Sequence, residues 1–290
     1  MEQALSLSRK AAEVFRERGI ENGRLDAELL LANVLAIDRL KLYLQHDRPV
    51  TPAELERFRD HVKRRLKREP VQYIIGVVGF RDITLKVDRR ALIPRPETEV
   101  LVGTVLAWLK EHAEGPASVL DIGTGTGAIA LSLASEATDC TTVATDVSAE
   151  ALALAAENTA MLGLGARVAL RQGDLWEAVW PGERFDVIVS NPPYVAESER
   201  ADLAPEVASW EPEAALFAQE AGLAVLSAII RRAHEYLRAR GLLALEIGAG
   251  QAVAVSALLS EAGHYTTPRV IRDLAGRDRI IVTEVERVEA

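Results

Sequence analysis

The chain has 290 residues, enough for one large core and a second small one, because domains cluster at roughly 100 to 200 residues. Hydrophobic residues make up 49% of the sequence and charged residues 27%, and the net charge is −9. No apolar run reaches the roughly 18 residues of a membrane span, the single cysteine cannot form an internal disulfide, and a negative charge is unsuited to coating nucleic acid.

The start of the chain and its cysteine and histidine residues give no sign of export or of metal binding. Residues 1–19 lack the basic start, apolar centre and cleavage site of a secretory signal, so a cytoplasmic protein is expected. The five histidines fall at no recognisable metal-ligand spacing, so we expect no metal. Cys140 stands just before an apolar strand and is expected to be a small buried residue rather than a nucleophile.

Residues 1–70 are expected to form a small helical bundle, because their apolar residues recur at helical spacing and no alternating strand pattern is present. Helices are predicted near 5–18, 26–35 and 39–45. The clearest start signal is Thr51-Pro52-Ala53-Glu54. A Thr N-cap, a Pro at the first helical position and a Glu three residues after the cap form a capping box.

Charge is distributed unevenly along the chain. Residues 1–75 carry a net charge of +3, which leaves −12 for the rest. The basic excess collects at Lys63-Arg64-Arg65-Leu66-Lys67-Arg68. This run is either the solvated C-terminal end of a helix, where cations suit the helix dipole, or a docking patch for a ribonucleoprotein or an acidic partner.

Residues 71–93 are expected to form a β-hairpin linker. Their β-prone stretches VQYIIG, GFRDITLKV and ALIP are separated by Gly76, Gly79 and a polar turn at 88–90. A helix is predicted to follow Pro96, where the second domain begins.

Residues 94–290 are expected to form one large α/β domain. Beyond Ala117 the predicted strands alternate with helices, which is typical of a mainly parallel, doubly wound sheet covered on both faces. The final two strands look like an antiparallel pair, and the sheet would have seven strands. The strands are predicted over 118–121, 142–145, 167–170, 185–190, 242–247, 269–272 and 280–284.

The first strand of this domain runs into the glycine-rich turn Gly123-Thr124-Gly125-Thr126-Gly127. Glycines let the backbone turn sharply and let a ligand approach the following helix N-terminus without meeting a Cβ. With Ala128 in the sixth place the turn also satisfies the dinucleotide fingerprint, so an NAD enzyme is an alternative. Asp121 favours a sulfonium cofactor, because a carboxylate can face the ammonium of a methionine moiety and would repel a pyrophosphate.

Two later acids follow strands on the same edge of the sheet. Asp146 comes 23 residues after Gly123 and is placed to accept hydrogen bonds from ribose hydroxyls; the alternative is a role at the start of the next helix. Asp174 could meet an adenine amino group, with Leu175 or Trp176 packed against the ring. A core position is the alternative for Trp176.

The apolar strand 185–190 ends directly at Asn191-Pro192-Pro193-Tyr194, which is the most specific signal in the chain. The two prolines end the sheet ladder and fix φ, so the backbone leaving the strand is rigid. The Asn191 side-chain oxygen and a carbonyl near Pro192 can accept both hydrogens of an sp² NH₂ group, and Tyr194 can cover its planar face. The alternative is a purely structural Pro-Pro turn.

A nitrogen held in this way needs no strong general base. The lone pair of an amide or aromatic amine is delocalised, and holding both N–H bonds aims that nitrogen at a methyl donor. Attack strengthens the same hydrogen bonds, and the proton can leave late. The sequence therefore predicts transfer of a methyl group to a planar nitrogen.

With these residues in place, nearly the whole chain resembles the release-factor glutamine methyltransferase family. The most discriminating stretch is Ile93-Pro94-Arg95-Pro96-Glu97-Thr98-Glu99, because Asn-Pro-Pro-Tyr is shared with enzymes that methylate adenine in DNA. Other similar segments are Gln72-Tyr73-Ile74-Ile75-Gly76, Ala214-Ala215-Leu216-Phe217-Ala218 and Glu246-Ile247-Gly248.

The resemblance implies a class I methyltransferase (Rossmann-like) fold that uses S-adenosyl-L-methionine. Its substrate would be the glutamine of the Gly-Gly-Gln loop in class I peptide-chain release factors, gripped by Asn191 to Tyr194. Residues 1–70 would help to dock the release factor. The resemblance places cofactor contacts at Gly123 to Gly127, Asp146, Trp176 and Asn191. An adenine-N6 methyltransferase is the alternative, but the −12 charge and the lack of a separate target-recognition domain argue against stable nucleic-acid binding.

Overall fold

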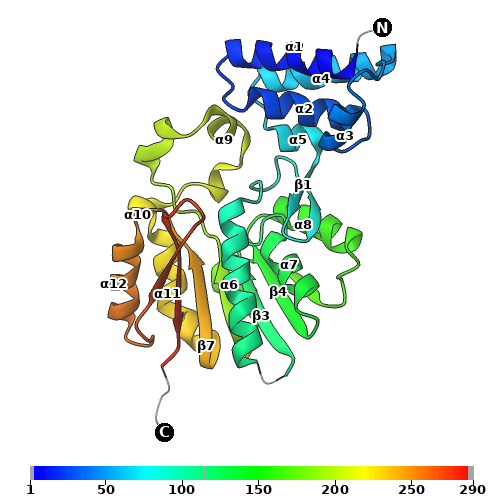
Figure 1. Ribbon diagram of the computed structural model, residues 1–290. Coiled ribbons are helices and arrows are strands. Elements are labelled where there is room, and N and C mark those ends of the chain that lie inside the picture. Colours follow the sequence, from blue (N-terminus) through cyan, green and yellow to red (C-terminus); the bar gives the residue numbers. More distant parts are fainter. Residues whose placement is uncertain (1–2, 114, 287–290) are drawn as a thin grey trace. The chain divides into compact units, whose positions relative to one another are not determined.

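The computed structural model describes residues 3–113 and 115–286. Its helices and strands form two compact units (Figure 1). The chain up to Val77 forms the first unit together with Ala204–Trp210, and the second consists of Val78–Leu203 and the chain from Glu211 onward. Among the described residues, none of the helices combines the length and the apolar composition that a membrane span needs.

The helices within residues 4–75 pack around a single apolar core, as the bundle predicted for 1–70 requires, and the helix at 205–210 adds no buried residue to that core. Phe15 and Phe58 are among the buried residues of this core. The predicted capping box is confirmed: Thr51 Oγ1 accepts from the Glu54 N–H, and the Glu54 carboxylate accepts from the Thr51 N–H at 2.8 Å. The helices are α1 (Ala4–Glu17), α2 (Gly23–Val34), α3 (Arg39–Leu44), α4 (Pro52–Leu66), α5 (Val71–Ile75) and α9 (Pro205–Trp210).

The β-prone character expected at the start of 71–93 is wrong, because Val71–Ile75 is the helix α5. A helix places Val71 and Ile74 on one side, where both join the core of the first unit. Gly76 ends the helix with φ +86, a left-handed conformation that favours glycine. The hairpin is confined to β1 (Val77–Phe80) and β2 (Ile83–Lys86).

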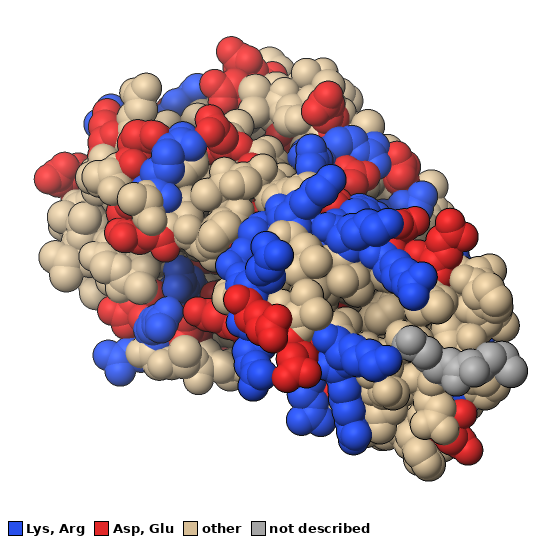
Figure 2. Space-filling view, turned by 90° about the horizontal axis from the view of Figure 1, so that it is seen from above, with Lys and Arg blue, Asp and Glu red and all other residues tan. Residues whose placement is uncertain are grey.

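The basic run at the end of α4 is largely paired with acids of its own unit. Arg65 is buried between Asp26, at 2.7 Å, and Glu206, at 2.9 Å. Arg64 contacts Glu69 at 2.6 Å. Figure 2 shows a face on which Lys and Arg side chains gather with Asp and Glu side chains among them. The ion pairs of Arg64 and Arg65 favour the interpretation of the run as a helix end over that of a docking patch.

The segment Ala204–Trp210 departs from the expectation that all of 94–290 forms one domain. Glu206 pairs with Arg65 of α4, and the Trp210 indole N–H donates to the Lys67 carbonyl at 3.3 Å. These contacts bind α9 to helices that lie far away in the sequence.

The second unit has a seven-stranded sheet in the order β5-β4-β3-β6-β7-β9-β8. Neighbouring strands from β5 to β7 are parallel, and β9 is antiparallel to both β7 and β8. The predicted doubly wound α/β fold is therefore confirmed. The strands are β3 (Ala117–Ile122), β4 (Cys140–Asp146), β5 (Val168–Gln172), β6 (Phe185–Ser190), β7 (Leu237–Glu246), β8 (Arg269–Arg272) and β9 (Asp278–Glu284).

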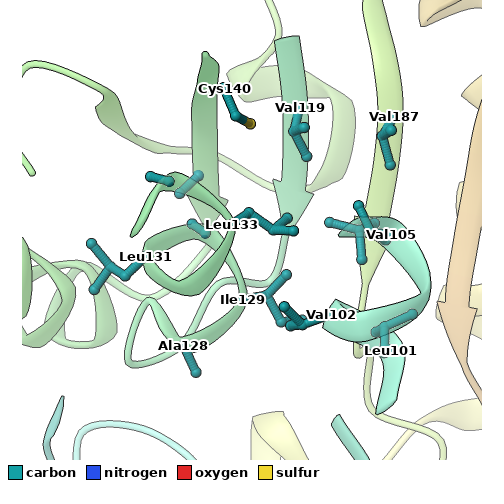
Figure 3. Packing of buried hydrophobic residues seen from close by; sticks show 14 of the residues in the cluster. Leu101, Val102, Val105, Val119, Ala128, Ile129, Leu131, Leu133, Cys140 and Val187 are labelled. Atoms are coloured by element: carbon teal, nitrogen blue, oxygen red, sulfur yellow. The ribbon is translucent and has the colours of Figure 1, made fainter. Parts of the chain in front are cut away.

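Helices cover both faces of this sheet. On β3, Val119 faces the core shared with α6 and α7, and Leu120 and Ile122 face the core shared with α11 and α12, as the two-residue period of a strand requires. Figure 3 shows the first core, where Val119 lies near buried Cys140 of β4. The longer helices are α6 (Pro96–His112), α7 (Ala128–Glu136), α8 (Ala149–Met161), α11 (Ala224–Tyr236) and α12 (Ala252–Ala262).

Short elements connect β5 to β6 and β6 to α11, and some of their residues reach the carboxyl edge of the sheet. They are η1 (Leu175–Ala178), η2 (Glu197–Asp202), η3 (Glu213–Ala215) and α10 (Gln219–Gly222).

Candidate active site

The glycine-rich turn joins β3 to α7 and is tied to the neighbouring strand. The N–H groups of Gly123 and Thr124 both donate to the Thr145 carbonyl at 2.9 Å. Gly127 has φ +85, and a Cβ there would lie 2.8 Å from Leu131 Cδ1. The left-handed backbone conformation therefore favours glycine at Gly127, and an added Cβ would also require the Leu131 side chain of α7 to move.

Asp146 holds this turn from the end of β4. Its Oδ2 accepts from the Gly125 N–H and its Oδ1 accepts from the Ser148 N–H, both at 2.9 Å. The side-chain cap of α8 is Ser148, which accepts from the Ala151 N–H at 3.1 Å. Each carboxylate oxygen of Asp146 keeps a further lone pair, and the residue lines a cavity.

Asp121 lies beneath the turn and does not line the cavity. Its side chain is fully buried, and Oδ2 accepts from the Thr124 hydroxyl at 2.7 Å and from the Ala130 N–H at 3.3 Å. Burial raises the pKa of Asp121 to about 7, and the hydrogen bond from Thr124 lowers it by less than burial raises it. The structure thus gives Asp121 a role in holding the loop, and its Oδ1 has no hydrogen-bond partner among the described residues. The ligand contact that the sequence suggested for Asp121 stays a prediction.

A cavity of about 270 Å³ opens at the carboxyl ends of β3, β4, β5 and β6, the edge where doubly wound sheets bind ligands. Eight of the predicted site residues line it. They are Gly123, Thr124, Gly125, Thr126, Asp146, Asn191, Pro192 and Pro193.

The cavity has a wall suited to a ligand without phosphates. Two arginines line it, and both are held by carboxylates: Arg90 by Asp88 at 2.7 Å and Glu157 at 2.8 Å, and Arg95 by Glu211 at 2.7 Å. The other charged groups on its described wall are acidic. A pyrophosphate would meet little uncompensated positive charge there, which argues against the dinucleotide alternative.

The structure does not bring Trp176 to the cavity. Its ring lies in the core, stacked on Tyr236 with centroids 4.8 Å apart, and its N–H donates to the Ala228 carbonyl at 3.2 Å. Leu175 and Asp174 line the cavity in its place. The core alternative for Trp176 therefore holds, because its N–H finds a partner inside the fold.

The exit of β6 is fixed by hydrogen bonds from other elements. The Ser190 hydroxyl donates to the Ile122 carbonyl at 2.7 Å. The Asn191 side-chain NH₂ donates to the Thr98 hydroxyl at 3.0 Å, and that hydroxyl donates to Glu246 Oε2 at 2.7 Å. Asn191 is therefore oriented by residues of α6 and β7.

Tyr194 is half-buried and does not line the cavity. Its hydroxyl donates to Glu246 Oε1 at 3.3 Å and accepts from Arg279 Nη1 at 3.5 Å. Its carbonyl accepts from the Gln251 side chain at 3.1 Å. Burial raises the pKa of the Tyr194 phenol, so it remains a hydrogen-bond donor.

Sequence reasoning did not identify Thr98 and Glu246 as site residues, although both stand in segments that carry the family resemblance. Their exposed fractions are only 4% and 1%. Burial raises the pKa of Glu246 to about 7, and the hydrogen bond from Thr98 lowers it by less than burial raises it. The available signal was an acid at the end of an apolar strand, on the edge of the sheet where ligands bind.

Comparisons with known proteins find matches over both the N-terminal part and the later part of the chain. Family models described as the PrmC N-terminal domain and the methyltransferase small domain match residues 6–76 and 98–208. The chain is similar to the release factor glutamine methyltransferase of Cereibacter sphaeroides, with 44% identity over 279 residues covering 96% of this chain and 97% of the relative. The protein of the same name from Geobacter sulfurreducens is 42% identical over 265 residues, 91% of this chain and 90% of that one.

Two solved structures are similar to this chain in fold. A methyltransferase from Pyrococcus furiosus has a TM-score of 0.51 and 19% identity, over 70% of this chain and 89% of that chain. The T. thermophilus 16S rRNA N2 G1207 methyltransferase, solved with AdoMet and guanosine, has a TM-score of 0.54 and 18% identity, over 73% and 50%. The expected class I methyltransferase fold is thus confirmed.

Proposed function

Because this chain belongs to the release factor glutamine methyltransferase family, we propose that it methylates the glutamine of the Gly-Gly-Gln motif in class I peptide-chain release factors. The methyl group comes from S-adenosyl-L-methionine and goes to the side-chain amide nitrogen. The observation that carries the proposal is Asn191 at the cavity wall, with its NH₂ tied to Thr98 and its oxygen left to accept.

The residues that line the cavity fit S-adenosyl-L-methionine. Asp146 offers its remaining lone pairs to the ribose hydroxyls, and Asp174 can accept from the adenine amino group. Leu175 and Ala151 supply apolar contact for the ring. The backbone of Gly123 to Gly127 leaves room for the methionine portion, because no Cβ projects from its glycines.

The sulfonium supplies an electrophilic methyl group when the cofactor is bound. The Asn191 oxygen and the Pro192 carbonyl accept the two N–H groups of the substrate amide and aim its nitrogen at that carbon. With the cofactor bound, transfer of its methyl group would leave a neutral thioether, and the substrate nitrogen would become more acidic, so that its hydrogen bond to the Asn191 oxygen strengthens. One proton then leaves the nitrogen for water, so no side-chain base is needed.

Two further roles belong to this proposal. Tyr194 does not line the cavity in the structure but directly follows the cavity-lining Pro193, and its ring is proposed to cover the planar amide once the substrate loop has entered. The helical bundle of residues 1–70, with the hairpin linker in 71–93, helps to dock the release factor, while 94–290 carries the chemistry. Because the basic run of α4 is largely paired, docking is expected to involve other surfaces of the bundle.

The test incubates the protein with methyl-labelled S-adenosyl-L-methionine and a purified class I release factor, followed by mass spectrometry of the Gly-Gly-Gln peptide. We expect one methyl group on the glutamine and none on a release factor with alanine in its place. Duplex DNA and NAD serve as the competing substrate and ligand. Label on DNA adenine with none on the release factor would overturn the proposal.

A further inference from the structure

A chain of hydrogen bonds runs from the end of β7 through the first turn of α6 to the exit of β6. Glu246 Oε2 accepts from the Thr98 hydroxyl at 2.7 Å, and the Thr98 oxygen accepts from the Asn191 NH₂ at 3.0 Å. Thr98 and Glu246 do not belong to the methyl-transfer step described above. Both are more than nine-tenths buried, so water does not compete for these bonds.

The chemistry of the three groups determines which of them donates in each hydrogen bond. An ionised carboxylate only accepts hydrogen bonds, and a hydroxyl has a single hydrogen. While Glu246 is ionised, Thr98 must therefore donate its hydrogen to Glu246, and the Thr98 oxygen can only accept from its other neighbour. The group of Asn191 that faces Thr98 must be the NH₂, and the carboxamide oxygen is left for another donor.

We propose that Thr98 and Glu246 are positioning residues which hold the Asn191 carboxamide so that its oxygen, and not its NH₂, meets the substrate amide. The inference rests on the proposed function for the identity of that substrate. With the opposite orientation, Asn191 would present N–H groups to the N–H groups of the glutamine side chain. Donor would then face donor, and the nitrogen would not be held.

The same carboxylate also holds the other end of the Asn-Pro-Pro-Tyr segment. Glu246 Oε1 accepts from the Tyr194 hydroxyl at 3.3 Å, and Arg279 Nη1 reaches that hydroxyl at 3.5 Å. Asn191 and Tyr194 are thus fixed from one buried anion, on either side of two prolines that restrict the backbone. Glu246 therefore acts on the site through Thr98 and Tyr194, although Glu246 itself does not line the cavity.

The decisive variants change Thr98, the central residue of the hydrogen-bond chain. Thr98→Val keeps the shape of the side chain but removes the hydroxyl, whereas Thr98→Ser keeps the hydroxyl. Thr104→Val is the matched control, because Thr104 lies on the same helix and its hydroxyl only donates to the Val100 carbonyl, at 2.9 Å. All variants are made in the full chain and compared by melting temperature.

For Thr98→Val we expect kcat to fall by roughly 10- to 100-fold, the loss expected for one or two hydrogen bonds. Thr98 also lines the cavity, but Thr98→Val keeps the shape of the side chain, so the Kd for S-adenosyl-L-methionine should change less than about twofold. Thr98→Ser should restore most of kcat, and Thr104→Val should behave as the parent does. Equal kcat for Thr98→Val and the parent would overturn the inference, and so would a Ser variant as slow as the Val variant.

A second measurement does not depend on turnover. The ¹⁵N NMR signal of the Asn191 side-chain NH₂ is identified by its loss in Asn191→Asp. The hydrogen exchange of this NH₂ group is then followed without substrate. We expect slow exchange in the parent and in Thr98→Ser, and faster exchange in Thr98→Val. Equal exchange in all three would contradict the positioning role. If the parent fails to label the release factor, the proposed function fails, and the exchange result still decides whether Thr98 orients Asn191.

Discussion

Arg95 and Glu211 form a two-oxygen ion pair, in which one guanidinium nitrogen lies 2.7 and 2.9 Å from the two carboxylate oxygens. The Glu211 side chain is only 1% exposed, and Arg95 lines the cavity. The pair joins the segment before α6 to the segment before η3, 116 residues later. It also removes a free positive charge from the wall that would receive a sulfonium.

Glu211→Gln should lower both stability and cofactor affinity. The buried charge pair is broken, which costs about 1 to 3 kcal/mol, and the released Arg95 repels a cationic ligand, weakening S-adenosyl-L-methionine binding by roughly 3- to 10-fold. Thermal unfolding and calorimetry measure the two effects. Glu213→Gln is the control, because its partner Arg200 is exposed and the pair contributes little. Equal melting temperatures for the two variants would refute this account.

Asn191→Ala should reduce kcat by about 10²- to 10³-fold, the cost of removing one preorganised polar partner at a reacting centre. Cofactor affinity should change little, because the amide oxygen acts on the substrate nitrogen. Single-turnover rates with release factor and calorimetry with S-adenosyl-L-methionine separate the two quantities. Unchanged turnover would remove Asn191 from the mechanism.

Asp146→Asn should weaken S-adenosyl-L-methionine binding by roughly 10- to 100-fold, because hydrogen bonds to a charged acceptor are lost on both the ribose and the glycine turn. Binding is measured by calorimetry. Asp139→Asn changes an exposed acid in the turn just before the same strand and should leave affinity as in the parent. Similar affinities for the two variants would argue against contact between Asp146 and the cofactor.

Asp121→Asn should change how stability depends on pH. Burial raises the pKa of Asp121 to about 7 from a usual value near 3.8, so ionisation is less favourable in the fold than in the unfolded chain. The contribution of this group to stability is complete below about pH 4 and is lost as the pH rises to about 7. Measured by urea unfolding, the variant should gain stability over the parent across this range and keep a constant advantage above it.

The rate of methyl transfer should fall as the pH is lowered through about 7, because the pKa of Glu246 is raised to about that value by burial. Protonated Glu246 can donate to Thr98 and reverse the hydrogen-bond chain. The groups that act on this carboxyl are the hydroxyls of Thr98 and Tyr194, with Arg279 and Glu97. Glu246→Gln should be slower and lack this step in its kcat profile; a profile identical to that of the parent would contradict the assignment.

The strands, the glycine turn and the capping box at Thr51 could be predicted from sequence because each is signalled by residues that are close together in the chain. Val71–Ile75 could not, since a five-residue apolar run is compatible with either a strand or a helix and the core of the bundle decides between them. The sequence also placed Trp176 beside the ligand. A loop tryptophan needs a partner for its N–H, and the Ala228 carbonyl, 52 residues away, supplies it.

The same limit applies to the polar residues of the site. Asp121 was expected to reach the ligand, but pattern alone does not show whether an acid at a strand end points into the cavity or below the turn. Thr98 and Glu246 meet across 148 residues, and only the packing of α6 against β7 brings them together. Local motifs identified which segments form the site, and long-range packing determined which atoms face one another.

The assignment of α9 to the helical unit has a practical consequence for dissecting the protein. The polypeptide crosses between the two units after Val77, after Leu203 and after Trp210. A fragment truncated to start at Val78 would therefore keep α9 while losing Arg65 and Lys67, which bind it. The released segment ends next to Glu211, the anchor of Arg95, so such a truncation would disturb cofactor binding without touching a single residue of the cavity.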